Sequence, residues 1–236
     1  MNPWRAFVEA VFPAVCPGCG RAAEPVCRAC ARTLRAPPAL PPPVGVDRWL
    51  APFAYEGVAR ELVARLKYRR TRATVPWLAA WMVRLVVVAG AGTDVGLVTW
   101  TPTTTPRRRD RGFDQAELLA RAVARELGLP ARPTLRRRPG PPQTGRPASA
   151  RRAGPRFETR PGALPARVLL VDDVATTGAT IAAAAAALRR AGVTSVIAVT
   201  AARTPRPGTA PRVSSKPPAY TRLMAAGSRR KNAGIP

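Results

Sequence analysis

Apolar and polar positions in the second half of the chain predict alternating strands and helices. Residues 167–204 comprise a continuous apolar stretch, a short polar turn, an alanine-rich segment and a second apolar stretch. Strands without polar alternation are typical of a parallel sheet covered by helices on both faces. Upstream, the pattern predicts helices over 57–67, 76–89 and 114–127, and a strand over 95–101. The sequence therefore predicts an α/β domain containing a βαβ unit.

Composition predicts the segments that flank and interrupt this domain. Residues 1–35 hold all four cysteines after a short predicted helix, and 36–52 are proline-rich, which predicts a stiff, extended linker. The globular domain is expected over 53–204, interrupted over 136–165 by a long mobile loop rich in Arg, Pro and Gly. Residues 205–236 contain no acidic side chain and many prolines, so we predict a disordered basic tail.

Charge and the absence of histidine narrow the chemistry. The 236 residues include 39 Lys and Arg against 13 Asp and Glu, a net charge of +26 that indicates nucleic acid, a phosphorylated small molecule or an anionic membrane face as a partner. A GC-rich genome, which over-represents arginine, alanine and proline, would also increase this charge. With no His, catalytic triads and histidine metal ligands are excluded. Because no export signal or membrane span is recognisable, we predict a cytoplasmic protein.

The cysteines form two C-x-x-C pairs, Cys16 with Cys19 and Cys27 with Cys30, separated by seven residues. This pattern predicts one tetrahedral Zn²⁺ site with four thiolate ligands, which leaves no open position for catalysis. A redox pair and a disulfide are the alternatives, and a reducing cytosol disfavours the disulfide. We expect a structural zinc knuckle, and its arginines raise the alternative of a nucleic-acid contact: Arg21, Arg28, Arg32 and Arg35.

The strongest chemical pattern is VLLVDDVATTGAT, from Val168 to Thr180. The apolar strand ends in Asp172 and Asp173, and a glycine-containing hydroxyl loop leads into the next helix. Ligands of open α/β sheets bind at the carboxyl ends of strands, and backbone N–H groups at a helix N-terminus bind phosphate. The carboxylates suit sugar hydroxyls or, indirectly, Mg²⁺. The alternative is an ordinary βα turn with capping threonines and solvated acids.

These thirteen residues resemble the phosphoribosyl-pyrophosphate signature of type I phosphoribosyltransferases. The resemblance implies that fold, a parallel sheet flanked by helices, with Mg²⁺-bound phosphoribosyl pyrophosphate as ligand. It assigns the ribose hydroxyls to Asp172 and Asp173. It assigns the 5′-phosphate to the loop residues Val174, Ala175, Thr176, Thr177, Gly178, Ala179 and Thr180.

Further segments resemble the ComF family of competence-associated proteins, in which a zinc knuckle precedes a phosphoribosyltransferase fold. They are the cysteine pairs, Leu66-Lys67-Tyr68, the stretch RGFDQAELLA from Arg111 to Ala120, and Gln143-Thr144-Gly145 before Arg151-Arg152. The resemblance implies Arg111 on the departing pyrophosphate, with Thr103 and Lys67 as further ligand-binding residues. It also implies a role in DNA uptake during natural transformation, with competence-machinery proteins as partners.

Three positions depart from the family pattern near the pyrophosphate side. Trp100-Thr101-Pro102-Thr103 replaces Pro-Val-Pro-Leu, Asp114 replaces the usual Asn, and Arg152-Ala153-Gly154-Pro155 lacks the asparagine of the R-x-x-N-V turn. An enzyme with an unknown acceptor is the first hypothesis. The second is a non-catalytic module that binds a phosphoribosyl ligand and single-stranded DNA, with Trp49, Tyr68 or Phe113 as stacking platforms. A nucleotide-salvage enzyme is a third, disfavoured by the zinc knuckle.

Overall fold

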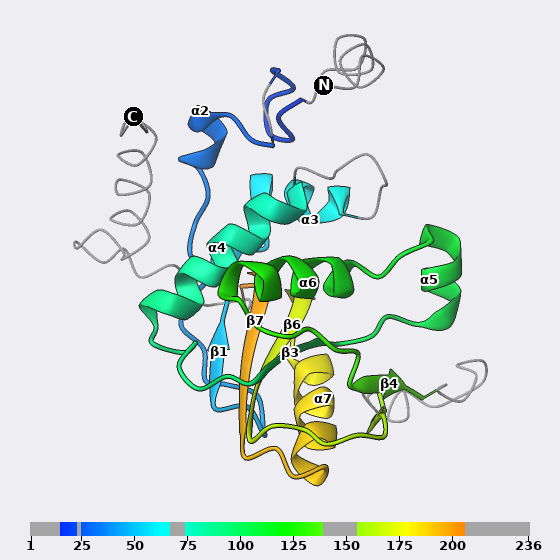
Figure 1. Cartoon of the computed structure of the whole chain (residues 1–236). Coiled ribbons are helices and arrows are strands. Elements are labelled where there is room, and N and C mark those ends of the chain that lie inside the picture. The colour runs from blue at the N-terminus through cyan, green and yellow to red at the C-terminus, as the bar shows by residue number, and fades with distance from the viewer. Residues whose placement is uncertain (1–14, 23–24, 67–73, 139–154, 206–236) are drawn as a thin grey trace, which may run out of the picture.

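Five parallel strands form the central sheet of the protein (Figure 1). The structure is a computed structural model, and it describes residues 15–22, 25–66, 74–138 and 155–205. In spatial order the strands are β1 (Arg48–Leu50), β7 (Ser195–Arg203), β6 (Arg167–Ala175) and β3 (Leu97–Trp100). Strand β2 (Phe53–Ala54) also pairs with β7, beyond the end of β1. The predicted α/β fold with a parallel sheet is confirmed.

The two faces of the sheet bury different side chains of the same strands. Leu169 and Val171 of β6 join the core under α3 (Gly57–Arg65), α4 (Thr74–Val88) and α6 (Gln115–Leu127). Val168 and Leu170 join the opposite core under α7 (Ala179–Arg190). Figure 1 shows α4 and α6 on one side of the sheet and α7 on the other. This arrangement explains why β6 and β7 carry apolar side chains on both faces.

The helix boundaries agree with capping residues and apolar patterns in the sequence. Asp114 caps α6 by accepting a hydrogen bond from the N–H of Ala116 (3.0 Å), and Gly128 ends the helix in the left-handed conformation, φ +67°. Helix α3 ends at Arg65, close to the predicted boundary, and Lys67 lies outside the described residues. The predicted elements over 76–89 and 95–101 correspond to α4 and β3 within two residues at each end.

The structure corrects two sequence expectations and adds one helix. The linker predicted over 36–52 ends in β1, because Arg48–Leu50 extends the sheet alongside β7. The loop predicted over 136–165 contains β4 (Leu135–Arg137) and β5 (Phe157–Thr159), an antiparallel pair whose Leu135 and Phe157 are buried against α7. The basic run before Gly112 forms a further helix, α5 (Thr105–Arg111), which ends at Arg111.

The cysteine segment packs on the domain that follows it. Helix α2 (Arg28–Ala31) leads to Leu34, which is buried in the core shared with α3, α4 and α6. A Cβ at Gly18 would lie 2.7 Å from Val58 of α3 and 2.8 Å from the sulfur of Cys30. Only a glycine therefore allows the first cysteine turn to approach both the second turn and the domain.

Candidate functional site

The predicted acidic pair lies on β6 just beyond the end of β3, since Trp100, the last residue of β3, is in register with Val171. Strand β6 continues past the pair to Ala175. The N–H of Thr101 donates to the carbonyl of Val171 at 3.1 Å, and the Thr101 side chain hydrogen-bonds to Asp172. Asp172 is 8% exposed, whereas Asp173 is half-buried. The two carboxylates accept hydrogen bonds from the N–H groups that follow them, at 2.9 Å for Asp173 N and 2.8 Å for Val174 N. The acids are thus fixed by their own backbone.

Electrostatics make Asp172 unusual among the acids of the protein. Burial raises the pKa of Asp172 well above its ordinary range, and the adjacent charge of Asp173 raises that pKa further. The hydrogen bonds from Thr101 and from the N–H of Asp173 act in the opposite direction but do not compensate. A ligand that favours the ionised carboxylate, such as a set of hydroxyl donors or a cation, would relieve this repulsion.

The loop after β6 has the geometry of an anion cradle. Thr176 and Thr177 are exposed, and Gly178 precedes α7 in the left-handed conformation with φ +79°. No described side chain caps α7 at Gly178; Thr177 Oγ1 instead accepts from the N–H of Ala179 at 3.3 Å. Unused N–H groups at the start of a twelve-residue helix, beside exposed hydroxyls, favour a phosphate.

Behind this loop lie residues that sequence reasoning did not assign to the site. A Cβ at Gly178 would lie 2.7 Å from Cγ of Pro43 and 3.5 Å from Cη2 of Trp49. Trp49 is buried, which excludes the exposed stacking platform considered for it, and its ring contacts Arg203. A single arginine at the end of an otherwise apolar strand was the only sequence signal for Arg203.

The loop that follows β3 brings the pyrophosphate-side candidates together. The N–H of Thr103 donates to Oδ2 of Asp114 at 2.8 Å, and Arg111 Nη1 donates to Oε1 of Gln115 at 3.1 Å. Gln115 is buried, and its Nε2 has no partner among the described residues. Arg111 is half-buried between α5 and α6. Asp114 thus shapes the backbone of this loop, which explains an acid at this position.

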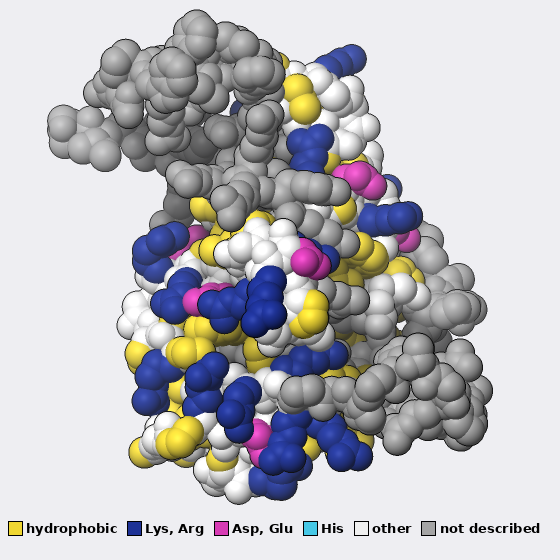
Figure 2. Space-filling model, turned by 90° about the vertical axis from the view of Figure 1, so that its right-hand side faces the viewer, with side chains coloured by type: hydrophobic (Ala, Val, Ile, Leu, Met, Phe, Trp, Pro, Cys, Tyr) yellow, Lys and Arg dark blue, Asp and Glu magenta, His cyan; other side chains and the backbone are white. Residues whose placement is uncertain are grey.

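Arginines gather on the face that carries α5, α6 and the β4–β5 pair (Figure 2). Two carboxylates are each shared by two of them: Glu117 by Arg108 (3.9 Å) and Arg121 (2.9 Å), and Glu158 by Arg136 (3.1 Å) and Arg138. The hydrogen bonds from Arg138 and then Arg136 lower the pKa of Glu158 to about 2. Each cluster keeps net positive charge, and further exposed arginines add to it: Arg109, Arg125, Arg132, Arg156 and Arg160.

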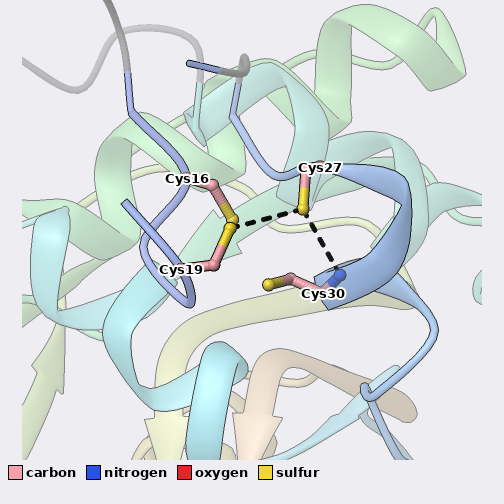
Figure 3. Close-up of side chains that lie close together, drawn as sticks. All are labelled: Cys16, Cys19, Cys27 and Cys30. Atoms are coloured by element: carbon pink, nitrogen blue, oxygen red, sulfur yellow. Dashed lines mark hydrogen bonds between the residues drawn. The ribbon is translucent and has the colours of Figure 1, made fainter. Parts of the chain in front are cut away.

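The four cysteines converge on one point (Figure 3). All four sulfurs lie within 4.8 Å of one another, and those of Cys19 and Cys27 are 3.6 Å apart. Tetrahedral coordination with Zn–S bonds of about 2.3 Å requires sulfurs about 3.8 Å apart. A hydrogen bond with Cys16 and burial raise the pKa of Cys30 to about 12, so the four thiols do not ionise together without a cation. Spacing and donor type therefore fit the predicted four-cysteine metal site.

Comparisons with known proteins agree with this geometry. The model of the phosphoribosyl transferase domain matches residues 114–216. The DNA utilization protein YhgH of Salmonella typhimurium is 29% identical over 189 residues, which cover 77% of this chain and 81% of that protein. The protein of the same name from Salmonella typhi matches over the same length with the same identity.

The chain therefore carries a phosphoribosyl transferase domain on a parallel sheet flanked by helices, consistent with the type I fold. Over most of its length it is also similar to the DNA utilization proteins of Salmonella, and a four-cysteine cluster lies ahead of the domain. The family resemblance, the fold and the leaning towards a transferase are confirmed at this level. In the described part of the chain, no helix is long and apolar enough to cross a membrane.

Proposed function

We propose that the protein binds phosphoribosyl pyrophosphate at the carboxyl edge of β6 and β3 and acts as a phosphoribosyltransferase. The observation that carries this proposal is that the carboxylates of Asp172 and Asp173 on β6 shortly precede the start of α7, where the N-cap residue Gly178 has no side chain to cap the helix. The two carboxylates suit vicinal hydroxyls, and the start of α7 suits a phosphate. A single ligand that carries both groups is a ribose 5-phosphate unit.

Each part of the edge has a role in this proposal. The loop from Thr176 to Thr180 would hold the 5′-phosphate, and Asp172 and Asp173 would orient the ribose and face a Mg²⁺ held by the pyrophosphate. In the reaction the bond between ribose C1 and a pyrophosphate oxygen breaks, and C1 forms a bond to the nucleophilic atom of the acceptor. Pyrophosphate leaves with the bonding electrons, and Arg111, with Thr103 beside it, would stabilise that charge. Lys67 is kept as a further ligand-binding candidate.

The experiment measures binding of phosphoribosyl pyrophosphate with Mg²⁺ by calorimetry, and pyrophosphate release with a panel of nucleobases and amines. We expect wild type to bind the ligand, and the double variant Asp172→Asn, Asp173→Asn to lose at least tenfold in affinity while remaining folded. The control is Glu126→Gln, because Glu126 is an acid near the C-terminal end of α6 and is not part of the proposed site.

Release above the rate without protein supports the enzyme, and binding without release supports a non-catalytic phosphoribosyl module. Wild type that fails to bind phosphoribosyl pyrophosphate would contradict both. The three departures near the pyrophosphate side bear on release more than on binding, since the loop from Thr176 to Thr180 keeps the whole pattern.

A second candidate function, binding of single-stranded DNA in the cytoplasm during uptake, is supported by the arginine face. Carboxylates shared between two arginines leave excess charge spread over α5, α6 and the β4–β5 pair. A spread-out cationic surface suits a polymer of phosphates better than one small ligand. The name of the Salmonella relatives points in the same direction. Competence-machinery proteins would be the partners in this role.

Salt dependence tests this candidate. Single-strand affinity should fall linearly on a log–log plot, with a slope of about 0.7 for each phosphate contacted. The double variant Arg136→Gln, Arg138→Gln should reduce the slope. The variant Arg60→Gln, Arg190→Gln removes equal charge from α3 and α7 and should leave the slope unchanged. Equal slopes for both double variants would show that Arg136 and Arg138 do not contact the DNA phosphates.

A further inference from the structure

Arg203 is a buried arginine at the carboxyl edge of the sheet. It is the last residue of β7, and only 4% of it is exposed. Its register partner is Ala175, the last residue of β6 before the phosphate loop, and the N–H of Thr204 donates to the carbonyl of Ala175 at 2.9 Å. The strand pairing therefore fixes the backbone of Arg203 beside the start of that loop.

The guanidinium is incompletely paired. Nη2 donates to the carbonyl of Pro38, and the guanidinium carbon lies 4.5 Å from the ring centroid of Trp49. Nε and Nη1 are buried without a hydrogen-bond partner among the described residues, and no carboxylate of that part of the chain forms an ion pair with the group. Burial lowers the pKa of Arg203, yet arginine does not lose its proton in proteins. The charge therefore persists without compensation.

Trp49 connects this charge to the phosphate loop. Cη2 of its ring lies 3.5 Å from the position that a Cβ of Gly178 would occupy, so one indole lies against the guanidinium and close to the residue before α7. The start of a helix carries partial positive charge from its unused N–H groups. Trp49 thus lies close both to a buried cation and to a helix N-terminus of the same sign. An anion is the group that would balance them.

We propose that Arg203 is the buried counter-charge for a phosphate held by the loop from Thr176 to Thr180. This inference deepens the proposed function, because it concerns the same loop, but it rests only on the phosphate and not on the ribose or pyrophosphate. The residue acts on the anion through its charge, from behind the loop and across the ring of Trp49. A cation supplied by β7 adds to the backbone cradle and favours a doubly charged phosphate over a neutral polar ligand.

The test uses inorganic phosphate as the probe and calorimetry on the full chain. Arg203→Met keeps an unbranched stem for the Trp49 contact and removes the charge. We expect its dissociation constant for phosphate to rise by about 10- to 100-fold, as for loss of a charged partner. Arg203→Lys retains a cation where the pH lies below the lysine pKa that burial lowers, and it should lose less phosphate affinity than Arg203→Met. The matched control is Arg167→Met at the amino end of β6, where Arg167 pairs with Asp94 at 3.5 Å.

Unliganded stability separates a counter-charge from a structural arginine. Removing an uncompensated buried charge should leave the thermal midpoint of phosphate-free Arg203→Met equal to or above that of wild type. A lowered midpoint together with unchanged phosphate affinity would assign Arg203 to structure alone and overturn the proposal. Should the methionine variant fail to fold, Arg203→Gln carries the same comparison, because glutamine removes the charge and keeps a polar side chain.

The outcomes also separate this inference from the proposed function. Wild type that binds phosphate but not phosphoribosyl pyrophosphate would contradict the proposed function and leave the role of Arg203 intact. Wild type that binds both ligands, with neutral variants at Arg203 that bind phosphate equally well, would overturn this inference alone. Wild type that binds neither would overturn both.

Discussion

The backbone N–H of Thr103 donates to Oδ2 of Asp114 at 2.8 Å, while Oδ1 of the same carboxylate accepts from the N–H of Ala116 at 3.0 Å. One buried side chain therefore joins the loop after β3 to the first turn of α6. Both carboxylate oxygens face N–H donors. Burial raises the pKa of Asp114 in spite of these hydrogen bonds, so its position is maintained against a desolvation cost.

Asp114→Asn is expected to destabilise the protein by about 1–3 kcal/mol, because the amide nitrogen would replace one acceptor and face an N–H donor. Chemical denaturation measures the loss. Asp110→Asn is the control, since Asp110 is exposed on α5. A variant as stable as wild type would mean that the loop does not depend on the second acceptor, although asparagine is usual at this position in the ComF family.

Asp172→Asn is expected to raise the thermal midpoint at neutral pH by a few degrees, because it removes a buried charge repelled by Asp173. The pKa of Asp172 is raised in the folded state, so the folded protein binds more protons than the unfolded chain. Wild-type stability should therefore fall as pH increases from the ordinary carboxyl range through this raised pKa. The gain from Asp172→Asn should grow in the same direction.

Thermal unfolding at several pH values checks this prediction. Asp110→Asn again serves as the control, since it changes the net charge equally without touching the pair. Stabilisation that is absent, or that grows as the pH is lowered, would show that repulsion between Asp172 and Asp173 does not limit stability.

Gly178→Ala is expected to lower the free energy of unfolding by more than the cost of placing an alanine in the left-handed conformation. The φ of +79° costs roughly 1–2 kcal/mol for a residue with a Cβ, and the new atom would lie 2.7 Å from Pro43. Gly192→Ala is a close control, because Gly192 has φ +90° and nothing within 4 Å of its Cβ position. The difference in unfolding free energy between the two variants isolates the contact with Pro43.

Phosphate affinity of the same two variants tests the cradle. Gly178→Ala should weaken binding because the N–H groups at the start of α7 shift, whereas Gly192→Ala, at the other end of α7, should not. Equal affinity in the two folded variants would reduce the loop to an ordinary βα turn.

Purified protein should contain one Zn²⁺ per chain by metal analysis, and Cys27→Ser should lose it. Metal binding is coupled to folding, so loss should expose the segment around α2 to proteases. Because Leu34 belongs to the main core, the domain should also lose some thermal stability, although it should remain folded. Arg28→Ser is the control on the same segment. Protein that is purified under reducing conditions and is then found to contain no zinc would contradict the metal site.

Sequence reasoning succeeded where the signal was local. The β6–α7–β7 unit was predicted because apolar runs, a glycine and an alanine-rich helix follow one another within forty residues. It failed for β1, β4 and β5, which have three residues each and depend on pairing with distant strands. The places of Pro43, Trp49 and Arg203 were missed for the same reason: the fold brings Pro43 and Trp49 to Gly178, and Arg203 to Trp49, from far along the chain. The domain limits, the tail and the roles of the site residues stay predictions.

The place of β7 in the sheet has a consequence for biosynthesis. It is the last described strand of the chain, yet it lies between β6 and β1, with Trp49 in register with Ala198. A nascent chain that ends before Ser195 has no partner for β1 or β2 and leaves one side of β6 open, and such edges pair readily with other chains. The sheet can close only when nearly the whole domain has left the ribosome. Premature termination within α7 should therefore produce an aggregation-prone fragment, not a smaller working domain.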